Sequence, residues 1–525
     1  MDCTQSFETF TKQAGLLLQP HQVAGVQWCL EHERDGILLG SQYPYSTDPE
    51  HKYALPRVQR KKPGYGFKCN ALPNVATQKK LRTPSPSPKM ESTETISMTQ
   101  PRRYHCGLIA DEMGLGKTIQ MLGTIWCNPV RRTLIIMPRV LLEQWESAIK
   151  KMTSNFSVIV YHGANVRKYD INDLTAANIV ITTYGMIAIR DHRPDSVLHQ
   201  VEWDRLVADE AHHVRNFKTR ASQGMRKLNA KIRWLMTGTP IQNQKKDLYS
   251  LCAAMGLPSG YYTKQENLMD FAKKFLLRRT KSEIGLNIPE LNDTTVAVEW
   301  NSKKEQQLAE SIHSELSFSG IEKTNMCASS GASTYCSVLP HLIRARQVCI
   351  LPSLTKIAST SGMTTSKLDA VCDHLLNPHT RNRPKLVFCH FRGEIDQIVN
   401  RTKSRDSTIN IRTLDGRAKQ SERTQILSET YDILVLQINT GCEGLNLQKY
   451  KDVYFVSPHW NPAVEDQAVA RCHRMGQDSN VNVYRFIMSD FSRKTPTSTL
   501  DNHSSLLQDQ KRELATNFNR LVSTM

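Results

Sequence analysis

The chain has 525 residues, 39% of them hydrophobic, which is enough for packed cores in about three domains of roughly 150 residues each. No unbroken apolar stretch reaches the ~18 residues of a membrane-spanning helix, and the first residues lack the pattern of a secretory signal, so we expect a soluble intracellular protein. The net charge of +18 is typical of a protein that binds a polyanion such as nucleic acid.

The 13 cysteines are scattered, and no two of them form a Cys-x-x-Cys pair. This pattern argues against a disulfide framework and against a zinc module of ordinary spacing. We therefore predict small buried thiols, and we expect neither zinc nor a membrane among the partners.

The segment 41–104 differs in composition from the rest of the chain. It is rich in proline and serine, holds nine of the 23 prolines, and carries twelve Lys or Arg against four Asp or Glu. Such a segment cannot bury enough apolar surface to offset the entropy of ordering it, so we predict a disordered basic insertion. Residues 1–40 are expected to be ordered and to belong to the first domain.

Short apolar runs alternate with helical patterns from 105 to about 243, and the alternation returns from about 366. Runs such as Leu134–Met137 and Leu386–Phe388 are typical of parallel strands that are buried on both faces. The predicted fold class is therefore α/β, with two parallel-sheet units. The expected boundaries are 105–290 for the first unit, 291–365 for a helical protrusion or linker, 366–490 for the second unit and 491–525 for a C-terminal helix.

A glycine-rich segment, Asp-Glu-Met-Gly-Leu-Gly-Lys-Thr, begins at Asp111 and opens a predicted helix. Gly114 and Gly116 let backbone N–H groups wrap phosphates, and the helix N-terminus adds positive potential. Lys117 would then reach the β- and γ-phosphates of ATP, and the Thr118 hydroxyl would bind Mg²⁺. Asp111 stands where the strict phosphate-loop pattern has its first glycine.

The sequence Asp-Glu-Ala-His begins at Asp209, directly after another predicted strand. A carboxylate at a strand end can hold Mg²⁺, and the neighbouring Glu210 can position and polarise the attacking water. An isolated pair of this kind is equally well explained as an acidic start of a helix. Its place in the same unit as Lys117 favours the nucleotide site.

Arg471 and Arg474 lie in the second unit, three residues apart, and so share one face of a predicted helix. An arginine supplied across a domain cleft can stabilise the charge that develops on a γ-phosphate. ATP binding would then draw the two units together, and hydrolysis would release them. If each unit grips a polymer, this cycle moves the protein along it.

A series of motifs in a fixed order resembles the Swi/Snf-type DNA-dependent ATPases of helicase superfamily two. The resemblance covers roughly residues 14–40, 105–300 and 340–520. The matching segments are Leu18–Gln22, Asp111–Thr118, Met137–Trp145, Asp209–His212, Met236–Asn243, Leu277–Lys281, Val387–His390, Asn439–Leu447 and Trp460–Gln477.

The resemblance implies two RecA-like lobes with helical protrusions, and an ATPase that double-stranded DNA stimulates and that uses ATP and Mg²⁺. The residues implied to bind the nucleotide are Gln22, Asp111, Gly114, Gly116, Lys117, Thr118 and Gln467, and those implied to bind the metal are Thr118 and Asp209. The implied catalytic residues are Glu210, Arg471, Arg474 and Lys117.

The resemblance also implies residues that connect the nucleotide site with DNA. The residues implied to couple the two sites are His212, Thr237 and Gly444. The residues implied to contact the DNA backbone are Thr183, Thr239, Asn439 and Thr440.

Within the family, the chain is most similar to the branch that contains helicase-like transcription factor and Lodestar. The string Trp460–Gln467, the pair Asp204–Arg205 and the insertion before the phosphate loop carry this likeness. Many members of that branch have a zinc-binding RING finger between the lobes. We expect no RING finger here, because no Cys-x-x-Cys pair occurs among Cys327, Cys336, Cys349 and Cys372.

The family likeness implies movement on duplex DNA and displacement of a DNA-bound protein, without strand separation. The segment from Leu447 to Gln467 is too short for a strand-splitting hairpin beside its core strand. Two alternatives stay open: an RNA-remodelling ATPase with the same lobes, and a DNA-binding scaffold with a degenerate ATP site. The expected location is intracellular, in the nucleus or at a site of viral DNA metabolism, and the oligomeric state is open.

Binding to DNA should be mostly electrostatic and independent of base sequence. We therefore predict that the affinity for duplex DNA falls by orders of magnitude between about 50 and 200 mM salt, because counterions are released on binding. Fluorescence anisotropy with two unrelated duplexes at several salt concentrations measures this dependence. An affinity that does not change with salt would contradict the prediction.

Overall fold

The computed structural model covers the whole chain and describes most of it in detail. The described residues are 7–9, 11–12, 15, 19–40, 43, 101–152, 156–191, 195–242, 244–286, 288–314, 316, 332–357, 363, 365–438, 445–491 and 498–523.

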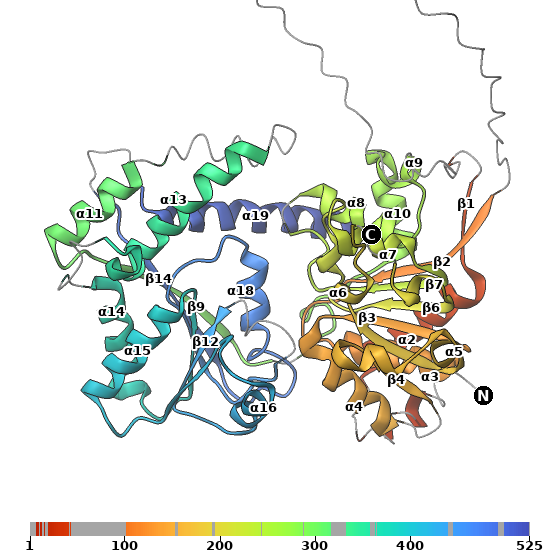
Figure 1. The fold of residues 1–525 in the computed structure, drawn as a ribbon, viewed down its shortest axis with the longest axis horizontal. Coiled ribbons are helices and arrows are strands. Elements are labelled where there is room, and N and C mark those ends of the chain that lie inside the picture. The colour runs from red at the N-terminus through yellow and green to blue at the C-terminus, as the bar shows by residue number, and fades with distance from the viewer. Residues whose placement is uncertain are drawn as a thin grey trace, which may run out of the picture.

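The first lobe is built on an eight-stranded sheet (Figure 1). Its strands are β1 (Ile37–Leu39), β2 (Arg102–Ile109), β3 (Thr133–Met137), β4 (Val158–Tyr161), β5 (Ile179–Thr183), β6 (Glu202–Ala208), β7 (Asn229–Met236) and β8 (Leu276–Leu277). They follow the order β1-β2-β7-β6-β3-β5-β4, with β8 also paired to β2. Each pair is parallel except β1 with β2.

Helices flank this sheet because both of its faces are apolar. They are α2 (Pro20–Asp35), α3 (Lys117–Cys127), α4 (Leu142–Met152), α5 (Ile171–Ala176), α6 (Tyr184–Ile187), α7 (Arg220–Lys227), α8 (Lys245–Ala254), α9 (Ser259–Tyr262) and α10 (Leu268–Phe275). In β3, Leu134 and Ile136 pack into one buried cluster, whereas Ile135 and Met137 pack into another. A strand covered on both sides accounts for the unbroken apolar run.

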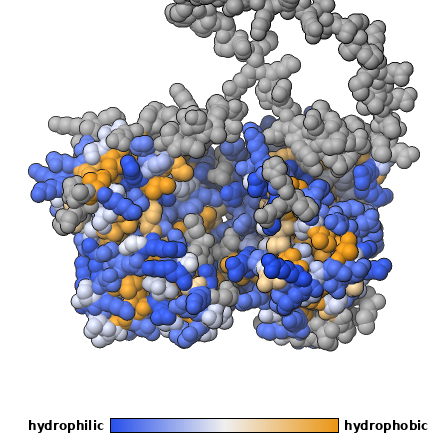
Figure 2. Space-filling view, viewed as in Figure 1, coloured by the Kyte–Doolittle hydropathy of each residue, from blue (hydrophilic) through white to orange (hydrophobic). Residues whose placement is uncertain are grey.

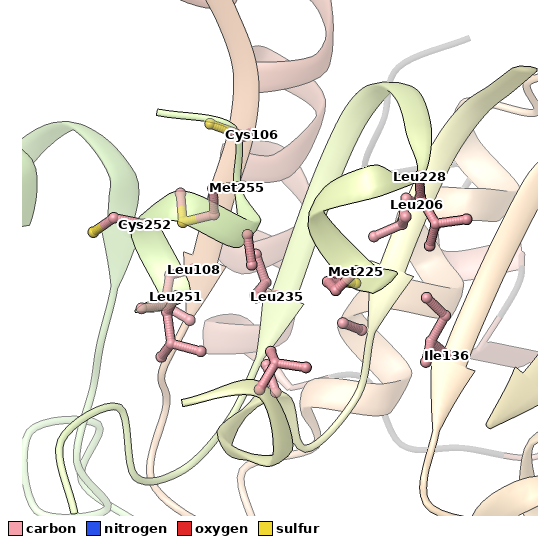
Figure 3. Packing of buried hydrophobic residues seen from close by; sticks show 14 of the residues in the cluster. Cys106, Leu108, Ile136, Leu206, Met225, Leu228, Leu235, Leu251, Cys252 and Met255 are labelled. Atoms are coloured by element: carbon pink, nitrogen blue, oxygen red, sulfur yellow. The ribbon is translucent and has the colours of Figure 1, made fainter. Parts of the chain in front are cut away.

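Figure 3 shows part of the first cluster, where side chains of the sheet meet those of α7 and α8. Leu108 and Leu235 come from neighbouring strands, and Met225 and Leu251 come from the helices. All four side chains are fully buried. This packing holds the carboxyl ends of β2, β6 and β7 in one place, and the predicted site residues follow those ends.

The second lobe contains a six-stranded, wholly parallel sheet in the order β11-β12-β10-β13-β14-β9. Its strands are β9 (Leu291–Val298), β10 (Lys385–Cys389), β11 (Ile411–Leu414), β12 (Ile433–Gln437), β13 (Asp452–Phe455) and β14 (Val481–Met488). The predicted fold class is therefore confirmed: α/β, with two parallel-sheet lobes.

The helices of the second half are α11 (Lys303–Ser314), α13 (Ala332–Ile350), α14 (Ser366–Leu375), α15 (Arg392–Arg405), α16 (Gln420–Ser428), α18 (Pro462–Val469) and α19 (Leu500–Ser523). Helix α19 crosses from the second lobe towards α8 and α10 of the first (Figure 1). Lys511 donates to the backbone oxygen of Trp460 at 2.7 Å, and Arg512 lies 3.3 Å from Asp466 on α18.

The helical segment expected over 291–365 is wrong at its start. Leu291–Val298 forms β9, an edge strand of the second sheet, paired with β14. Its run Thr294–Val298 is mostly β-branched, which favours a strand, and Asp293 forms an ion pair with Arg485 of β14 at 3.0 Å. The true helical segment begins at α11.

The boundary predicted at 104 is also displaced, because β2 begins at Arg102 and pairs with β1 across the insertion. Of the predicted basic insertion 41–104, only Tyr43 and residues 101–104 are among the described residues, so the predicted disorder lies outside them. Figure 2 shows that hydrophilic residues cover most of the visible face of both lobes, interrupted by separate apolar areas. No helix among the described residues is long and apolar enough to cross a membrane.

A buried ion pair fastens α2 to the first sheet. Arg205 of β6 donates through Nε to Glu33 at 2.6 Å, and both side chains are fully buried. The Glu33 carboxylate also accepts hydrogen bonds from Nε1 of Trp234 at 2.8 Å and from Nδ2 of Asn128 at 2.7 Å. The likeness to one family branch rested in part on Arg205, and in the structure this residue holds α2 against the sheet.

Replacing Glu33 by alanine should destabilise the first lobe by roughly 3–5 kcal/mol, because Arg205 would stay buried without its partner. Urea unfolding followed by tryptophan fluorescence measures the free energy of unfolding. The control is Glu31→Ala on the exposed side of the same helix, which should change stability by less than about 0.5 kcal/mol. Equal effects of the two substitutions would contradict this account.

Candidate active site

The phosphate loop lies between β2 and α3. Gly114 has φ +92° and Gly116 has φ +80°, a left-handed backbone that side chains rarely adopt. A Cβ at Gly116 would lie within 2.3 Å of Nε2 of Gln22, and a Cβ at Gly114 would lie 3.2 Å from Cβ of Arg474. Glycine is therefore required at both positions, and Gln22 and Arg474 lie against the loop from opposite lobes.

Asp111 anchors the loop through its buried carboxylate. The carboxylate accepts hydrogen bonds from Arg279, at 3.0 Å through Nε and a second time through Nη2, and from Gln120 at 2.9 Å. The backbone oxygen of Asp111 accepts a further bond from Nζ of Lys117 at 2.7 Å, and the nucleotide-binding role of Asp111 stays a prediction. Arg279 was not among the predicted site residues, although its segment, Leu277–Lys281, was one of the matching motifs.

Lys117 begins α3, beside Thr118, and its ammonium group is held within the loop. Nζ donates to the backbone oxygens of Asp111 at 2.7 Å and of Glu112 at 3.3 Å. Burial lowers the pKa of Lys117, while the nearby carboxylates of Glu210 and Asp111 oppose that shift. A buried cation at a helix N-terminus is a fitting place for a polyphosphate, which would supply the compensating charge.

Asp209 and Glu210 follow β6 at the centre of the first sheet. Asp209 accepts a hydrogen bond from Trp145 Nε1 at 2.8 Å, and its backbone oxygen accepts one from Tyr184 at 2.6 Å. Burial and the adjacent Glu210 raise the pKa of Asp209. An extra positive charge such as Mg²⁺ would offset the cost of holding two carboxylates here, so this site fits the metal.

Glu210 has φ +51°, one of two left-handed non-glycine residues in the described part of the chain. Burial would raise the pKa of its carboxyl group, but His212, Arg471 and Lys117 outweigh burial and lower it. Glu210 therefore stays ionised. A strained backbone at this position costs energy, and such strain is concentrated at functional sites.

The second lobe contributes two arginines to the same site. Nη2 of Arg471 lies 3.6 Å from Oε1 of Glu210. Burial and the neighbouring charge of Arg471 lower the pKa of Arg474, which lies against Gly114. Gln467 is buried, and its Nε2 has no hydrogen-bond partner in the described structure. The arrangement suits an anion between the lobes, with Gln467 free to donate to it.

A chain of polar contacts runs from Glu210 to the second lobe. His212 lies 3.3 Å from Glu210, and Thr237 lies 3.4 Å from His212. The backbone N–H of Thr239 donates to Thr237 at 3.2 Å, and Gln242 donates to Thr239 at 2.8 Å.

This series of polar contacts crosses the lobe boundary at its last member, where Asn461 at the start of α18 donates to Gln242 at 2.9 Å. The predicted coupling residues His212 and Thr237 thus lie on one connected path. Gln242 and Asn461 were not predicted, although both belong to matching motifs. A motif shows that a residue is present, but it does not show which residue of the other lobe it meets.

The predicted DNA contacts are only partly described. Thr183 ends β5, is buried, and lies 3.3 Å from Nδ1 of His162. Thr239 lines a cavity of about 470 Å³ between the lobes. Asn439, Thr440 and the coupling residue Gly444 lie outside the described residues.

Comparison with known families gives two matches that cover most of the described core. The family model of the SNF2-related domain matches residues 21–261, and that of the helicase conserved C-terminal domain matches residues 366–476. The first match contains Lys117, Asp209 and Glu210, and the second contains Arg471 and Arg474.

Several named proteins are similar to most of this chain. A probable global transactivator of Orgyia pseudotsugata multicapsid polyhedrosis virus is 28% identical, over 78% of this chain and 86% of its own. The putative ATP-dependent helicase/translocase YwqA of Bacillus subtilis is 26% identical, over 77% and 46%. The ISWI chromatin-remodeling complex ATPase ISW2 of Saccharomyces cerevisiae is 27% identical, over 73% and 37%, so the chain spans less than half of these two cellular relatives.

Among solved structures, the SWI2/SNF2 ATPase core of Sulfolobus solfataricus in complex with dsDNA is similar at 25% identity. The match covers 79% of this chain and 92% of that one, with a TM-score of 0.33.

Replacing Gln242 by alanine should lower the DNA-stimulated rate of ATP hydrolysis more than the basal rate, because it removes the hydrogen bond between the lobes. We expect a loss of roughly five-fold in the stimulated rate, the value of about 1 kcal/mol for one neutral hydrogen bond. Asn461→Ala should give the same loss, and the double variant should be no worse than either.

The matched control is Gln223→Ala, which removes an exposed side-chain amide bond to the backbone oxygen of Lys218, outside the series of contacts between the lobes. This substitution should leave both rates unchanged. Equal reductions of the basal and stimulated rates by Gln242→Ala would show that the contact serves hydrolysis itself rather than communication with DNA.

Proposed function

We propose that this chain, a member of the Swi/Snf-type ATPases of helicase superfamily two, moves along double-stranded DNA by closing and opening its lobes around ATP. It is an ATP-hydrolysing enzyme. The observation that carries the proposal is the contact of Glu210 in the first lobe with Arg471 in the second, at 3.6 Å. A site completed by both lobes makes hydrolysis depend on their closure.

In the proposed reaction, Lys117 and the amides at the start of α3 would bind the β- and γ-phosphates, and Gln22, which lies against Gly116 of the loop, would contact the adenine. Glu210 would accept a hydrogen bond from the attacking water, which positions the water and polarises it for attack. Arg471 and Arg474 would stabilise charge on the γ-phosphate as it develops. Thr118 and Asp209 would hold Mg²⁺, which when bound would supply positive charge against the phosphates.

Movement of the lobes provides the mechanical step. Insertion of a γ-phosphate between Glu210 and Arg471 would favour the closed arrangement, and loss of the phosphate would release it. The path through His212, Thr237 and Gln242 connects this event to Asn461 in the second lobe. If Thr183 and Thr239 in the first lobe, and Asn439 and Thr440 in the second, contact the DNA backbone, each cycle shifts one grip relative to the other.

The named relatives support DNA as the track. One is described as an ATP-dependent helicase/translocase and another as a chromatin-remodeling complex ATPase. These descriptions also support a DNA-bound protein as the object displaced. A nuclear location, or a site of viral DNA metabolism, suits both this function and the viral relative.

The conformation of residues 447–467, in the second lobe, supports movement without strand separation. In the described residues 447–467 the chain forms β13, a buried core strand, and then begins α18. No strand pair projects from this stretch to split a duplex. Helicase motifs in this chain would therefore serve translocation on intact DNA.

We expect duplex DNA to stimulate ATP hydrolysis strongly, and single-stranded DNA and RNA to stimulate it weakly. Glu210→Gln should lower the rate by roughly 100-fold or more, since the carboxylate that handles the water is lost. A coupled phosphate-release assay with each nucleic acid measures both effects. Glu31→Gln, on an exposed face of α2, is the control and should match the unmodified protein.

Stimulation by RNA alone would overturn the assignment of the track while leaving the ATPase intact. Absence of hydrolysis with every nucleic acid would favour a DNA-binding scaffold instead.

A further inference from the structure

Trp145 lies beneath the catalytic carboxylates, although its side chain belongs to none of the predicted sites. It lies on α4, is 1% exposed, and packs in the same cluster as Ile135 of β3 and Val207 of β6. A buried indole N–H needs an acceptor, because leaving it unpaired costs the full desolvation of the group. The acceptor here is Oδ2 of Asp209, at 2.8 Å.

Every polar atom of Asp209 takes part in a hydrogen bond. Its backbone N–H donates to Ile136 at 2.8 Å, and its backbone oxygen accepts the hydroxyl of Tyr184 at 2.6 Å. Its Oδ1 accepts the backbone N–H of Glu210 at 2.9 Å, and its Oδ2 accepts Trp145. Both oxygens of the carboxylate are therefore fixed, each by a donor that cannot act as an acceptor.

This arrangement leaves a defined part of the carboxylate for a further ligand. An ionised carboxylate has about four acceptor positions, of which Glu210 and Trp145 each fill one. The remaining lone pair on each oxygen is available to a cation or to a water bound to it. Because an indole N–H is only a donor, Trp145 also fixes the rotation of the carboxylate about its Cβ–Cγ bond.

We propose that Trp145 is a positioning residue for the divalent cation: its N–H orients the Asp209 carboxylate for metal binding. The inference rests on the proposed function, in which Asp209 holds Mg²⁺. Groups that orient metal ligands in this way typically change metal affinity by roughly 10–100-fold when they are removed. Trp145 does not touch the nucleotide or the reacting water in this assignment, so its effect should appear in metal binding first.

The chain offers a closely matched control for the loss of a buried indole bond. Trp203 is also 1% exposed and lies on β6, the strand that leads to Asp209. Its N–H donates to the backbone oxygen of Leu198 at 3.0 Å, at the far end of the strand from the carboxylates. Trp203→Phe therefore removes the same kind of group from the same sheet without touching the site.

The test measures the affinity of Mn²⁺ for the complex of the full chain with a non-hydrolysable ATP analogue, by electron paramagnetic resonance. Trp145→Phe should weaken Mn²⁺ binding about ten-fold, whereas Trp203→Phe should not. Binding of a fluorescent form of this ATP analogue, measured without metal, should be the same in both variants. This last readout separates an effect on the metal from a general distortion of the site.

Unchanged Mn²⁺ affinity in Trp145→Phe, or equal weakening in both variants, would overturn the inference. If Trp145→Phe does not fold, site-specific insertion of benzothienylalanine decides the matter, because sulfur replaces the N–H at nearly constant volume. Weaker Mn²⁺ binding by the protein with benzothienylalanine supports the proposal, and unchanged Mn²⁺ binding overturns it. If the unmodified complex takes up no Mn²⁺, the proposed metal site is itself wrong, and that failure is distinct from failure of Trp145 alone.

Discussion

Two adjacent carboxylates at the end of one buried strand need compensating positive charge, and the rest of the site supplies it. Asp209 and Glu210 repel each other and are poorly solvated, so neither is stable as a charged group without compensation. Lys117 provides part of it from the phosphate loop of the same lobe. Arg471 provides another part from the second lobe, and this requirement ties the chemistry to the distance between the lobes.

The interface between the lobes is accordingly polar and specific. Gln242 bonds to Asn461, and Lys281 donates to the backbone oxygen of His473 at 3.0 Å, beside Arg474. Helix α19 adds contacts with both lobes. A few directional bonds of this kind stabilise one closed arrangement, but each is worth only about 1 kcal/mol, so nucleotide binding is able to shift the balance.

The sequence was informative where local pattern decides structure. Runs such as Ile179–Thr183 show that a strand is buried on both faces, and Gly114 and Gly116 show that a backbone must adopt unusual angles. The ionisable residues Lys117, Asp209, Glu210 and Arg471 meet in space, although Arg471 and Arg474 lie in turns after α18 and not on the predicted helix.

What the sequence did not show are contacts that depend on tertiary packing. Arg279 lies 168 residues from Asp111 along the chain, and Trp145 lies on α4, a helix far from Asp209 in the sequence. Strand β9 was assigned to the helical segment although Thr294–Val298 is mostly β-branched, because its exposed residues lack the apolar run of a buried strand. The grip on DNA by Asn439 and Thr440 stays a prediction.

The central claim is that ATP hydrolysis moves the protein along intact duplex DNA. The most direct measurement is displacement of a labelled third strand from a triplex that lies on a duplex, with a forked duplex as the parallel substrate. The account predicts that the third strand is released only with ATP and only by the chain with Glu210 intact, while the forked duplex stays paired. Separation of the forked duplex, or ATP hydrolysis without release of the third strand, would contradict it.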